Sequence, residues 1–212
     1  MNEILAQIKR LGIVPVVAIE EAADAVKLGE ALIKGGLPCA EITFRTEAAA
    51  DAIRALSQSY PEMLVGAGTV LTVVQAQIAL NAGAKFIVTP GFDADVVDWC
   101  LEKGMPIVPG VMTPTEINMG LKKGLNVLKF FPAEAAGGVK SLKAISGPYR
   151  GVKFIPTGGI RPSNLKDYLS LPAVLACGGS WLVKKDLISA GEFETITRLS
   201  KEAVGMVREL RA

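Results

Sequence analysis

The chain has 212 residues, of which 50% are hydrophobic but only 6% aromatic. This length suits one domain, and a core built from aliphatic side chains is typical of a parallel sheet covered by helices. The formal net charge is only +2, and no run of lysine and arginine indicates binding to nucleic acid or to an anionic membrane surface. The N-terminus lacks a signal-peptide pattern and no apolar stretch is long enough to span a membrane, so we expect a cytoplasmic protein.

Histidine is absent from the sequence, which excludes Ser-His-Asp and Cys-His mechanisms and every histidine-based metal site. The three cysteines, Cys39, Cys100 and Cys177, are far apart and lack the CxxC spacing of a redox or metal motif. We therefore expect them to be reduced core residues, and we expect no metal. General acid–base chemistry must then use a carboxylate, a lysine, a tyrosine or a cysteine.

Eight short apolar segments alternate with helix-period segments along the whole chain. The predicted strands are 14–19, 39–45, 64–69, 86–91, 106–111, 127–133, 153–159 and 173–179. The stretches between them include 20–36 and 47–60, which have the periodicity of amphipathic helices. Several helical stretches end at glycine just before the next strand, at Gly35-Gly36, Gly83, Gly104 and Gly124.

This alternation predicts an α/β protein with parallel strands and right-handed crossovers, folded as one (β/α)8 barrel domain over 1–212. An open, doubly wound sheet is the competing architecture. No GxGxxG follows the first predicted strand, and eight evenly spaced units suit a closed barrel better.

Polar residues interrupt two of the predicted strands. Glu41, Thr43 and Arg45 occupy alternate positions, so they share one face, and the apolar opposite face should meet the helices. Glu41 and Arg45 should then point inward, either as a structural ion pair or as part of a site. Lys129 lies in the apolar segment VLKFFP, where its long stem could reach solvent. If it points inward, desolvation disfavours the ammonium form and leaves a nucleophilic amine.

Glycine pairs end the last two predicted strands, at 158–159 and 178–179. Such pairs are often no more than tight turns, but loops after strands seven and eight of a (β/α)8 barrel commonly bind phosphate. We therefore expect a phosphate site there. A carboxylate and an inward lysine in the same pocket point to Schiff-base chemistry, with Glu41 as the proton shuttle.

The ordered motifs resemble the lysine-dependent 2-keto-3-deoxy-6-phosphogluconate (KDPG) and 4-hydroxy-2-oxoglutarate (KHG) aldolases. They are EITFRT (41–46), VGAGTVL (65–71), VTPG (88–91), PGVMTPTE (109–116), LKFFPAE (128–134), GPY (147–149), PTGG (156–159) and GGSWLV (178–183). They cover nearly the whole chain and together are highly specific.

The resemblance implies a role for each of twelve residues. Lys129 would form the Schiff base, and Glu41 would be the acid and base. The remaining positions would bind substrate: Arg45 and Thr69 the carboxylate of the pyruvyl group, Pro90 and Phe131 the pyruvate pocket, Thr157 the aldehyde, and Gly158, Gly159, Gly178, Gly179 and Ser180 the phosphate.

The resemblance also implies reversible cleavage of KDPG to pyruvate and glyceraldehyde 3-phosphate by a homotrimer that needs no metal or other cofactor. The main substrate could instead be KHG or the phosphogalactonate epimer, although Arg45-Thr46 favours the gluconate and oxoglutarate type. A sugar-phosphate isomerase or epimerase would also use the glycine loops, as would a barrel that only binds a phosphorylated ligand. Neither of these two functions gives Glu41 and Lys129 a joint role.

Overall fold

Parallel strands alternate with helices along the residues that the computed structural model describes, 2–211. The strands are β1 (Ile13–Val17), β2 (Cys39–Thr43), β3 (Leu64–Gly68), β4 (Ile87–Val88), β5 (Ile107–Val108), β6 (Gly110–Val111), β7 (Val127–Phe130), β8 (Lys153–Pro156) and β9 (Cys177–Gly179). The helices are α1 (Glu3–Leu11), the 3-10 turn η1 (Ala22–Asp24), α2 (Ala25–Lys34), α3 (Ala49–Ser59), α4 (Val73–Asn81), α5 (Ala94–Glu102), α6 (Pro114–Lys122), α7 (Gly138–Ser146), α8 (Pro162–Leu169), α9 (Lys185–Ser189) and α10 (Phe193–Arg211).

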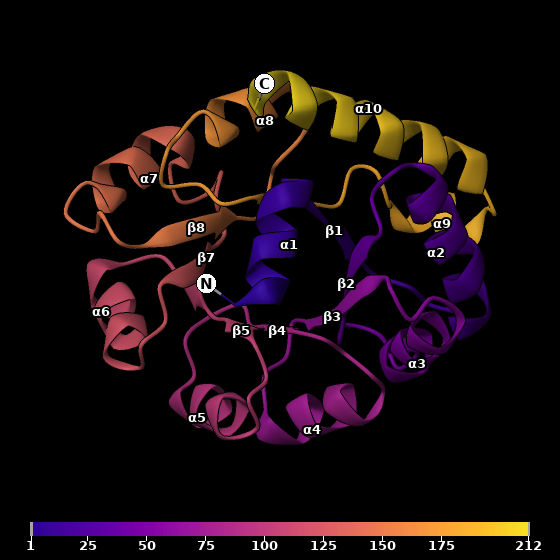
Figure 1. Cartoon of the computed structure of the whole chain (residues 1–212), viewed down its shortest axis with the longest axis horizontal. Helices are drawn as coiled ribbons and strands as arrows, with labels where there is room; N and C mark the ends of the chain where they lie inside the picture. The colour runs from indigo at the N-terminus through magenta and orange to yellow at the C-terminus, as the bar shows by residue number, and fades with distance from the viewer. Residues whose placement is uncertain (1, 212) are drawn as a thin grey trace.

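The strands form two parallel sheets, with orders β5-β4-β3-β2-β1-β9 and β6-β7-β8. Two isolated parallel bridges, Phe154 to Val174 and Thr157 to Gly178, link β8 and the residue after it to the β9 segment. Helices α2 to α8 and α10 surround the strands (Figure 1). The predicted α/β class with parallel strands is confirmed.

The predicted strands are found, but most are shorter than expected at their carboxyl ends. The segment predicted as 127–133 pairs only over β7, and 39–45 pairs only over β2. The segment 106–111 is divided into β5 and β6 at Pro109, which has no N–H to donate to a neighbouring strand. These early ends leave residues free to form the loops that follow the strands.

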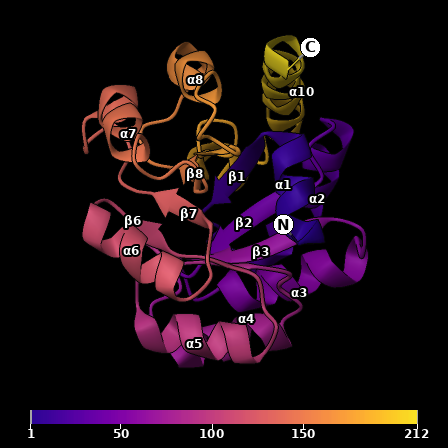
Figure 2. The ribbon, with the colours of Figure 1, turned by 60° about the vertical axis from the view of Figure 1, so that its left-hand side comes forward.

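The core has two layers, one between strands and helices and one enclosed by the strands. Outward residues such as Ile42 and Leu128 belong to the layer that packs against the helices. The inner layer gathers near the amino ends of the strands, and its members are Ile8, Val14, Cys39, Leu64, Phe86, Val88, Val108, Val127, Ile155, Leu175 and Ala176. Ile8 belongs to α1, which lies across the amino ends of the strands (Figures 1 and 2).

Glycine ends the helices as predicted. Gly36, Gly83, Gly104 and Gly124 all have positive φ, the left-handed conformation that a side chain would disfavour. The cysteine prediction is also confirmed, since all three thiols are buried and free. Burial raises the pKa of each, that of Cys100 to about 12, so they stay protonated and inert. No helix within 2–211 is long and apolar enough to cross a membrane.

A capping box fixes the start of α6. The Thr113 hydroxyl accepts a hydrogen bond from the Glu116 N–H, while a Glu116 carboxylate oxygen accepts from the backbone N–H groups of Met112 and Thr113, each at 2.8 Å. Partial burial opposes ionisation of Glu116, but these hydrogen bonds and one from the Thr113 hydroxyl lower its pKa. The loop after β6 is therefore stabilised by a charged acceptor.

Candidate active site

A cavity of about 230 Å³ opens at the carboxyl ends of the strands. Its lining comes from seven strands or the loops that follow them: Val16, Arg45, Thr69, Pro90, Lys129, Phe131, Thr157, Gly158, Gly159, Ile160, Gly178 and Ser180. Nine of the ten predicted substrate-binding residues are therefore in this lining, together with Lys129. The carboxyl end is where enzymes with this alternation of strands and helices place their chemistry.

Lys129 reaches the floor of the cavity from the middle of β7. Its backbone pairs with Gly110 on one side and with Ile155 on the other, and its N–H donates to the Pro109 carbonyl at 2.9 Å. Because neighbouring residues Leu128 and Phe130 face the helices, strand alternation turns Lys129 inward. Its side chain is only 5% exposed. The long stem therefore does not carry the ammonium group to open solvent.

Glu41 lies beside Lys129, in β2. The distance from Lys129 Nζ to Glu41 Oε1 is 3.8 Å, and the Glu41 side chain is 4% exposed. This distance exceeds a direct hydrogen bond, and Oε1 accepts no hydrogen bond from any residue in 2–211. A buried ion pair without further hydrogen bonds contributes little to stability, because desolvation offsets the Coulomb attraction. Its geometry does suit a base that acts on a substrate bound covalently to Nζ.

The space for Glu41 exists because β3 has no side chain opposite it. A Cβ on Gly68 would lie 2.1 Å from Glu41 Oε1, and one on Gly66 would lie 2.3 Å from the Phe86 ring. Real Cβ atoms do not approach other atoms so closely. The glycines of the GAGT motif thus make room for the carboxylate and for the inner core below it.

An aromatic ring and a guanidinium group border the lysine. Lys129 Nζ lies 4.8 Å from the centroid of the Phe131 ring, within cation–π range. Arg45 lies two residues beyond β2, where its exposed guanidinium group donates from Nε to Thr43 Oγ1 at 3.1 Å. Thr43 in turn donates to the Val17 carbonyl at 2.7 Å. Arg45 is therefore tied to two strands at the rim and does not fill the interior as a strand residue would.

Thr69 adopts a strained backbone at the edge of the cavity. Its φ is +55°, and it is the one residue other than glycine with positive φ among those the structure describes. For a β-branched residue this conformation costs about 1–3 kcal/mol, and such strain is characteristic of functional sites. The observation favours a use for its hydroxyl, since glycine would fit the backbone better.

The two glycine loops lie side by side. Thr157 pairs with Gly178, and a Cβ on Gly178 would lie 2.3 Å from Thr157 Oγ1. Gly158 and Gly159 both have positive φ, at +99° and +79°. Both loops therefore bring bare backbone to the cavity, which is how proteins approach an anionic oxygen closely.

Some sequence-based assignments differ from the observed lining. Gly179 and Glu41 are not in the cavity lining. A Cβ on Gly179 would lie 1.9 Å from the Trp181 ring, so packing accounts for this glycine. Val16 and Ile160 do line it but were not predicted. Their only sequence signal is their position at or just after a strand end. Within 2–211, no three histidine, cysteine, aspartate or glutamate side chains gather closely enough to hold a metal ion.

Comparison with known proteins agrees with this geometry. The model of the KDPG and KHG aldolase family matches residues 4–199. The chain belongs to this family. A KDPG aldolase of Treponema pallidum is 50% identical over 98% of the chain and 99% of its own length, and the KHG/KDPG aldolase of Escherichia coli K12 is 47% identical over 91% and 90%.

A solved KDPG aldolase of Legionella pneumophila has a TM-score of 0.92 and 40% identity, covering 95% of this chain and 98% of its own. That structure holds pyruvate captured at low pH as a covalent carbinolamine intermediate. A carbinolamine is the adduct of an amine and a carbonyl, so pyruvate is bound covalently in this aldolase relative.

Proposed function

We propose that this member of the KDPG and KHG aldolase family is a Schiff-base aldolase that reversibly cleaves KDPG to pyruvate and glyceraldehyde 3-phosphate. The observation that carries the proposal is the buried pair of Lys129 and Glu41, 3.8 Å apart, in which Lys129 lines the cavity and Glu41 is buried next to it. An amine can form an imine and a neighbouring carboxylate can move protons, and cleavage beside a ketone needs both.

The reaction begins when the neutral Lys129 amine adds to the C2 carbonyl of the substrate. The carbinolamine takes up one proton, which the final hydrolysis releases again, and loses water to give a protonated imine. Glu41 removes the proton of the C4 hydroxyl, the C3–C4 bond breaks, and its electron pair forms an enamine as the aldehyde leaves. Glu41 then returns the proton to C3, and water hydrolyses the pyruvyl imine to release pyruvate and the free lysine.

The cavity lining would orient the substrate. The Arg45 guanidinium group suits a planar carboxylate, and the Thr69 hydroxyl lies in the same lining. Pro90 and Phe131 would enclose the pyruvyl group, and Thr157 would contact the aldehyde. The glycine loops at 158–159 and 178–179, with Ser180, would bind the phosphate ester, although Gly179 would act through its packing on Trp181.

A second activity, cleavage of KHG to pyruvate and glyoxylate, has support from one relative. The protein of Escherichia coli K12 that is 47% identical is named KHG/KDPG aldolase. KHG carries no phosphate, so its turnover would depend on the lysine, the carboxylate and Arg45 but not on the glycine loops. Comparing KHG with KDPG therefore separates the two parts of the site.

We also propose that the two sheets together form one closed (β/α)8 barrel and that residues 1–212 are a single domain. The support is the pair of bridges from β8 to the β9 segment and the short break at Pro109 between β5 and β6. The family resemblance supports a homotrimer, and the similarity to a curated KDPG aldolase, a metabolic enzyme, supports a cytoplasmic location.

Reduction with borohydride in the presence of pyruvate tests the mechanism. Mass spectrometry should find one pyruvyl adduct, and peptide mapping should place it on Lys129. An isomerase, an epimerase or a phosphate-binding barrel would gain no covalent mass. An adduct on another lysine, with Lys129 unmodified, would contradict the mechanism. Full activity should also survive exhaustive chelation, whereas activity that depended on added Mg²⁺ or Mn²⁺ would point to a metal as the electron sink.

A further inference from the structure

The continuation of β7 holds the glycine loop at 157–159 by its backbone. After β7 ends, the Ala133 N–H donates to the Thr157 carbonyl at 2.8 Å, and the Glu134 N–H donates to the Gly158 carbonyl at 3.1 Å. The motif LKFFPAE therefore supplies more than Lys129 and Phe131. Its last two residues form the support of the loop in which Gly158 and Gly159 lie.

The Glu134 side chain then extends this support to α8. A Cβ on Gly159 would lie 2.5 Å from Glu134 Cγ, so the stem of Glu134 lies directly against the glycine. At its far end, Glu134 Oε1 accepts a hydrogen bond of 2.5 Å from the Tyr168 hydroxyl. Tyr168 is fully buried in α8. One glutamate thus joins a glycine with positive φ, whose backbone has many accessible conformations, to a packed helix.

The protonation state of Tyr168 favours this contact. Burial and the hydrogen bond to Glu134 raise the pKa of the Tyr168 hydroxyl, so it stays protonated and donates. Glu134 forms no ion pair with any residue in the described part of the chain. The carboxylate is exposed, and the proposed reaction does not use it. Neither an ion pair nor the chemistry therefore accounts for its hydrogen bond to the buried Tyr168 hydroxyl.

We propose that Glu134 and Tyr168 are positioning residues that hold the 157–159 loop in the shape that binds the phosphate ester. This inference rests on the proposed function, since it concerns the phosphate end of the same site. Two consecutive glycines with positive φ can adopt many other conformations, and these would change the backbone that the loop presents to the phosphate. Contact with Glu134 along one side of Gly159 limits that freedom. Asn164 Nδ2, which donates to the Gly159 carbonyl at 3.1 Å, limits it from the α8 side.

Tyr168→Phe tests the proposal because it removes the hydroxyl and keeps the buried ring. We expect the KM for KDPG to rise about threefold to tenfold, the usual worth of one hydrogen bond. The inhibition constant of inorganic phosphate against KDPG should rise by the same factor. The KM for the unphosphorylated analogue, 2-keto-3-deoxygluconate, should stay close to wild type, because this substrate has no phosphate for the loop to bind. A general structural defect would instead raise the KM for both substrates.

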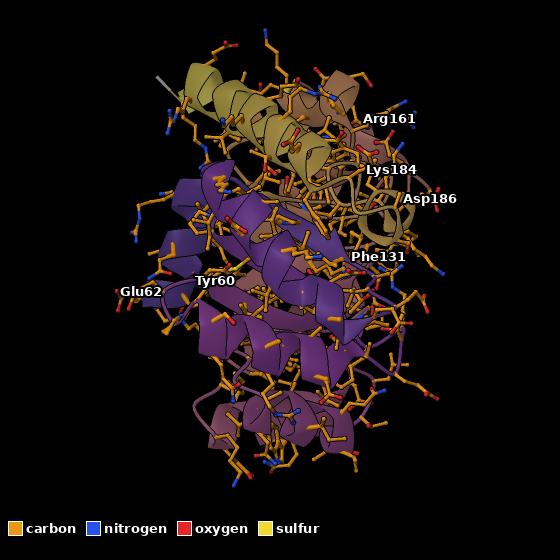
Figure 3. All side chains as sticks on the ribbon, turned by 90° about the vertical axis from the view of Figure 1, so that its right-hand side faces the viewer. Tyr60, Glu62, Phe131, Arg161, Lys184 and Asp186 are labelled. Carbon is orange, nitrogen blue, oxygen red and sulfur yellow. The ribbon has the colours of Figure 1, made fainter. Side chains whose placement is uncertain are left out.

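Two further variants control for loss of structure. Glu134→Gln keeps the stem on Gly159 and an oxygen that accepts from Tyr168, so its KM for KDPG should be at or below the wild-type value, whereas Glu134→Ala should behave as Tyr168→Phe does. Tyr60→Phe is the matched control. The Tyr60 hydroxyl donates to the Val26 carbonyl at 3.2 Å, and Tyr60 lies on the opposite side of the molecule from Phe131 and Arg161 in the view of Figure 3.

The outcomes separate the positioning role from the proposed function. If the wild-type enzyme shows no preference for KDPG over its unphosphorylated analogue, the phosphate site of the proposed function is wrong and the positioning role falls with it. If the wild type has the preference and Tyr168→Phe leaves it unchanged, only the positioning role is overturned. An equal rise in KM for both substrates would likewise assign Tyr168 to general stability.

Discussion

The two ends of the strands are built from the same backbone but serve opposite purposes. At the amino ends, inward side chains such as Ile8, Phe86 and Val108 are almost completely buried. At the carboxyl ends the strands stop early, and the inward positions hold Glu41, Lys129 and Thr157 under an open cavity. The packed amino end can thus compensate for two unfavourable features at the carboxyl end. These are the Glu41 oxygen without a hydrogen bond and the positive φ of Thr69.

The largest expected effect is at the boundary between these ends. Lys129→Arg should keep the fold and lose nearly all aldolase activity, because guanidinium stays protonated and cannot form an imine. The measurements are turnover of KDPG, thermal unfolding, and trapping with borohydride and pyruvate. Substantial activity in a folded Lys129→Arg protein would show that the lysine is not part of the mechanism. The division between a structural amino end and a catalytic carboxyl end would then lack its main support.

Glu41→Gln should have the next largest effect. The amide keeps the shape of the side chain but cannot accept the proton, so turnover should fall by about 10²–10⁴-fold. Exchange of the pyruvate methyl protons with deuterated water, followed by NMR at saturating pyruvate, should slow as well, although some imine should remain trappable. Exchange near the wild-type rate would reduce Glu41 to an ion-pair partner of Lys129.

A cavity at the amino end should change stability and leave chemistry intact. Ile8→Ala removes a side chain that is 1% exposed and should lower the free energy of unfolding by about 2–5 kcal/mol. Turnover of the folded enzyme should stay close to wild type. The matched control is Ile78→Ala, since Ile78 in α4 is 41% exposed and its loss should cost far less. A large fall in turnover for Ile8→Ala would show that the two ends are not separable.

The smallest expected effect is a loss of stability at the carboxyl end of the strands, in the loop after β6. Glu116→Ala should lower the free energy of unfolding by about 1 kcal/mol, because it removes the capping box of α6. The pKa of Glu116 is lowered in the folded protein, so its contribution is present above the ordinary glutamate pKa and is lost as pH falls through the folded value. Urea unfolding should show that the difference in free energy of unfolding between Glu116→Ala and wild type becomes smaller from pH 7 to pH 3. The control Glu102→Ala, at the exposed end of α5, should differ little from wild type at any pH.

Periodicity in the sequence predicted the elements well because apolar alternation records which faces are buried. It predicted inward positions for Glu41 and Lys129 for the same reason. It overestimated strand lengths, since the chain stays apolar beyond the last ladder hydrogen bond, as in the FFPA segment after Lys129. The early end of β2 is also why Arg45 lies at the rim.

Long-range contacts account for what periodicity did not predict. Tyr168 and Glu134 are 34 residues apart, and neither has a local pattern that indicates the other. The position of α1 across the amino ends of the strands was likewise not predicted. Its apolar face contacts residues from several strands, and periodicity alone does not identify such partners. Gly179 was assigned to phosphate together with Gly178 from the family resemblance, and the sequence pattern does not indicate the contact of Gly179 with the Trp181 ring.

The bare interior face of β3 has a consequence for how such a sequence can change. The volume that Gly68 lacks is occupied by Glu41 of the adjacent strand, so the two positions behave as one unit. An alanine at 68 fits only if the acid retracts, as in a paired Gly68→Ala and Glu41→Asp exchange. A substitution that adds volume at 68 should therefore be tolerated only together with a shorter side chain at 41. A library that varies one strand at a time would miss every workable combination, and one that varies both strands together would find them.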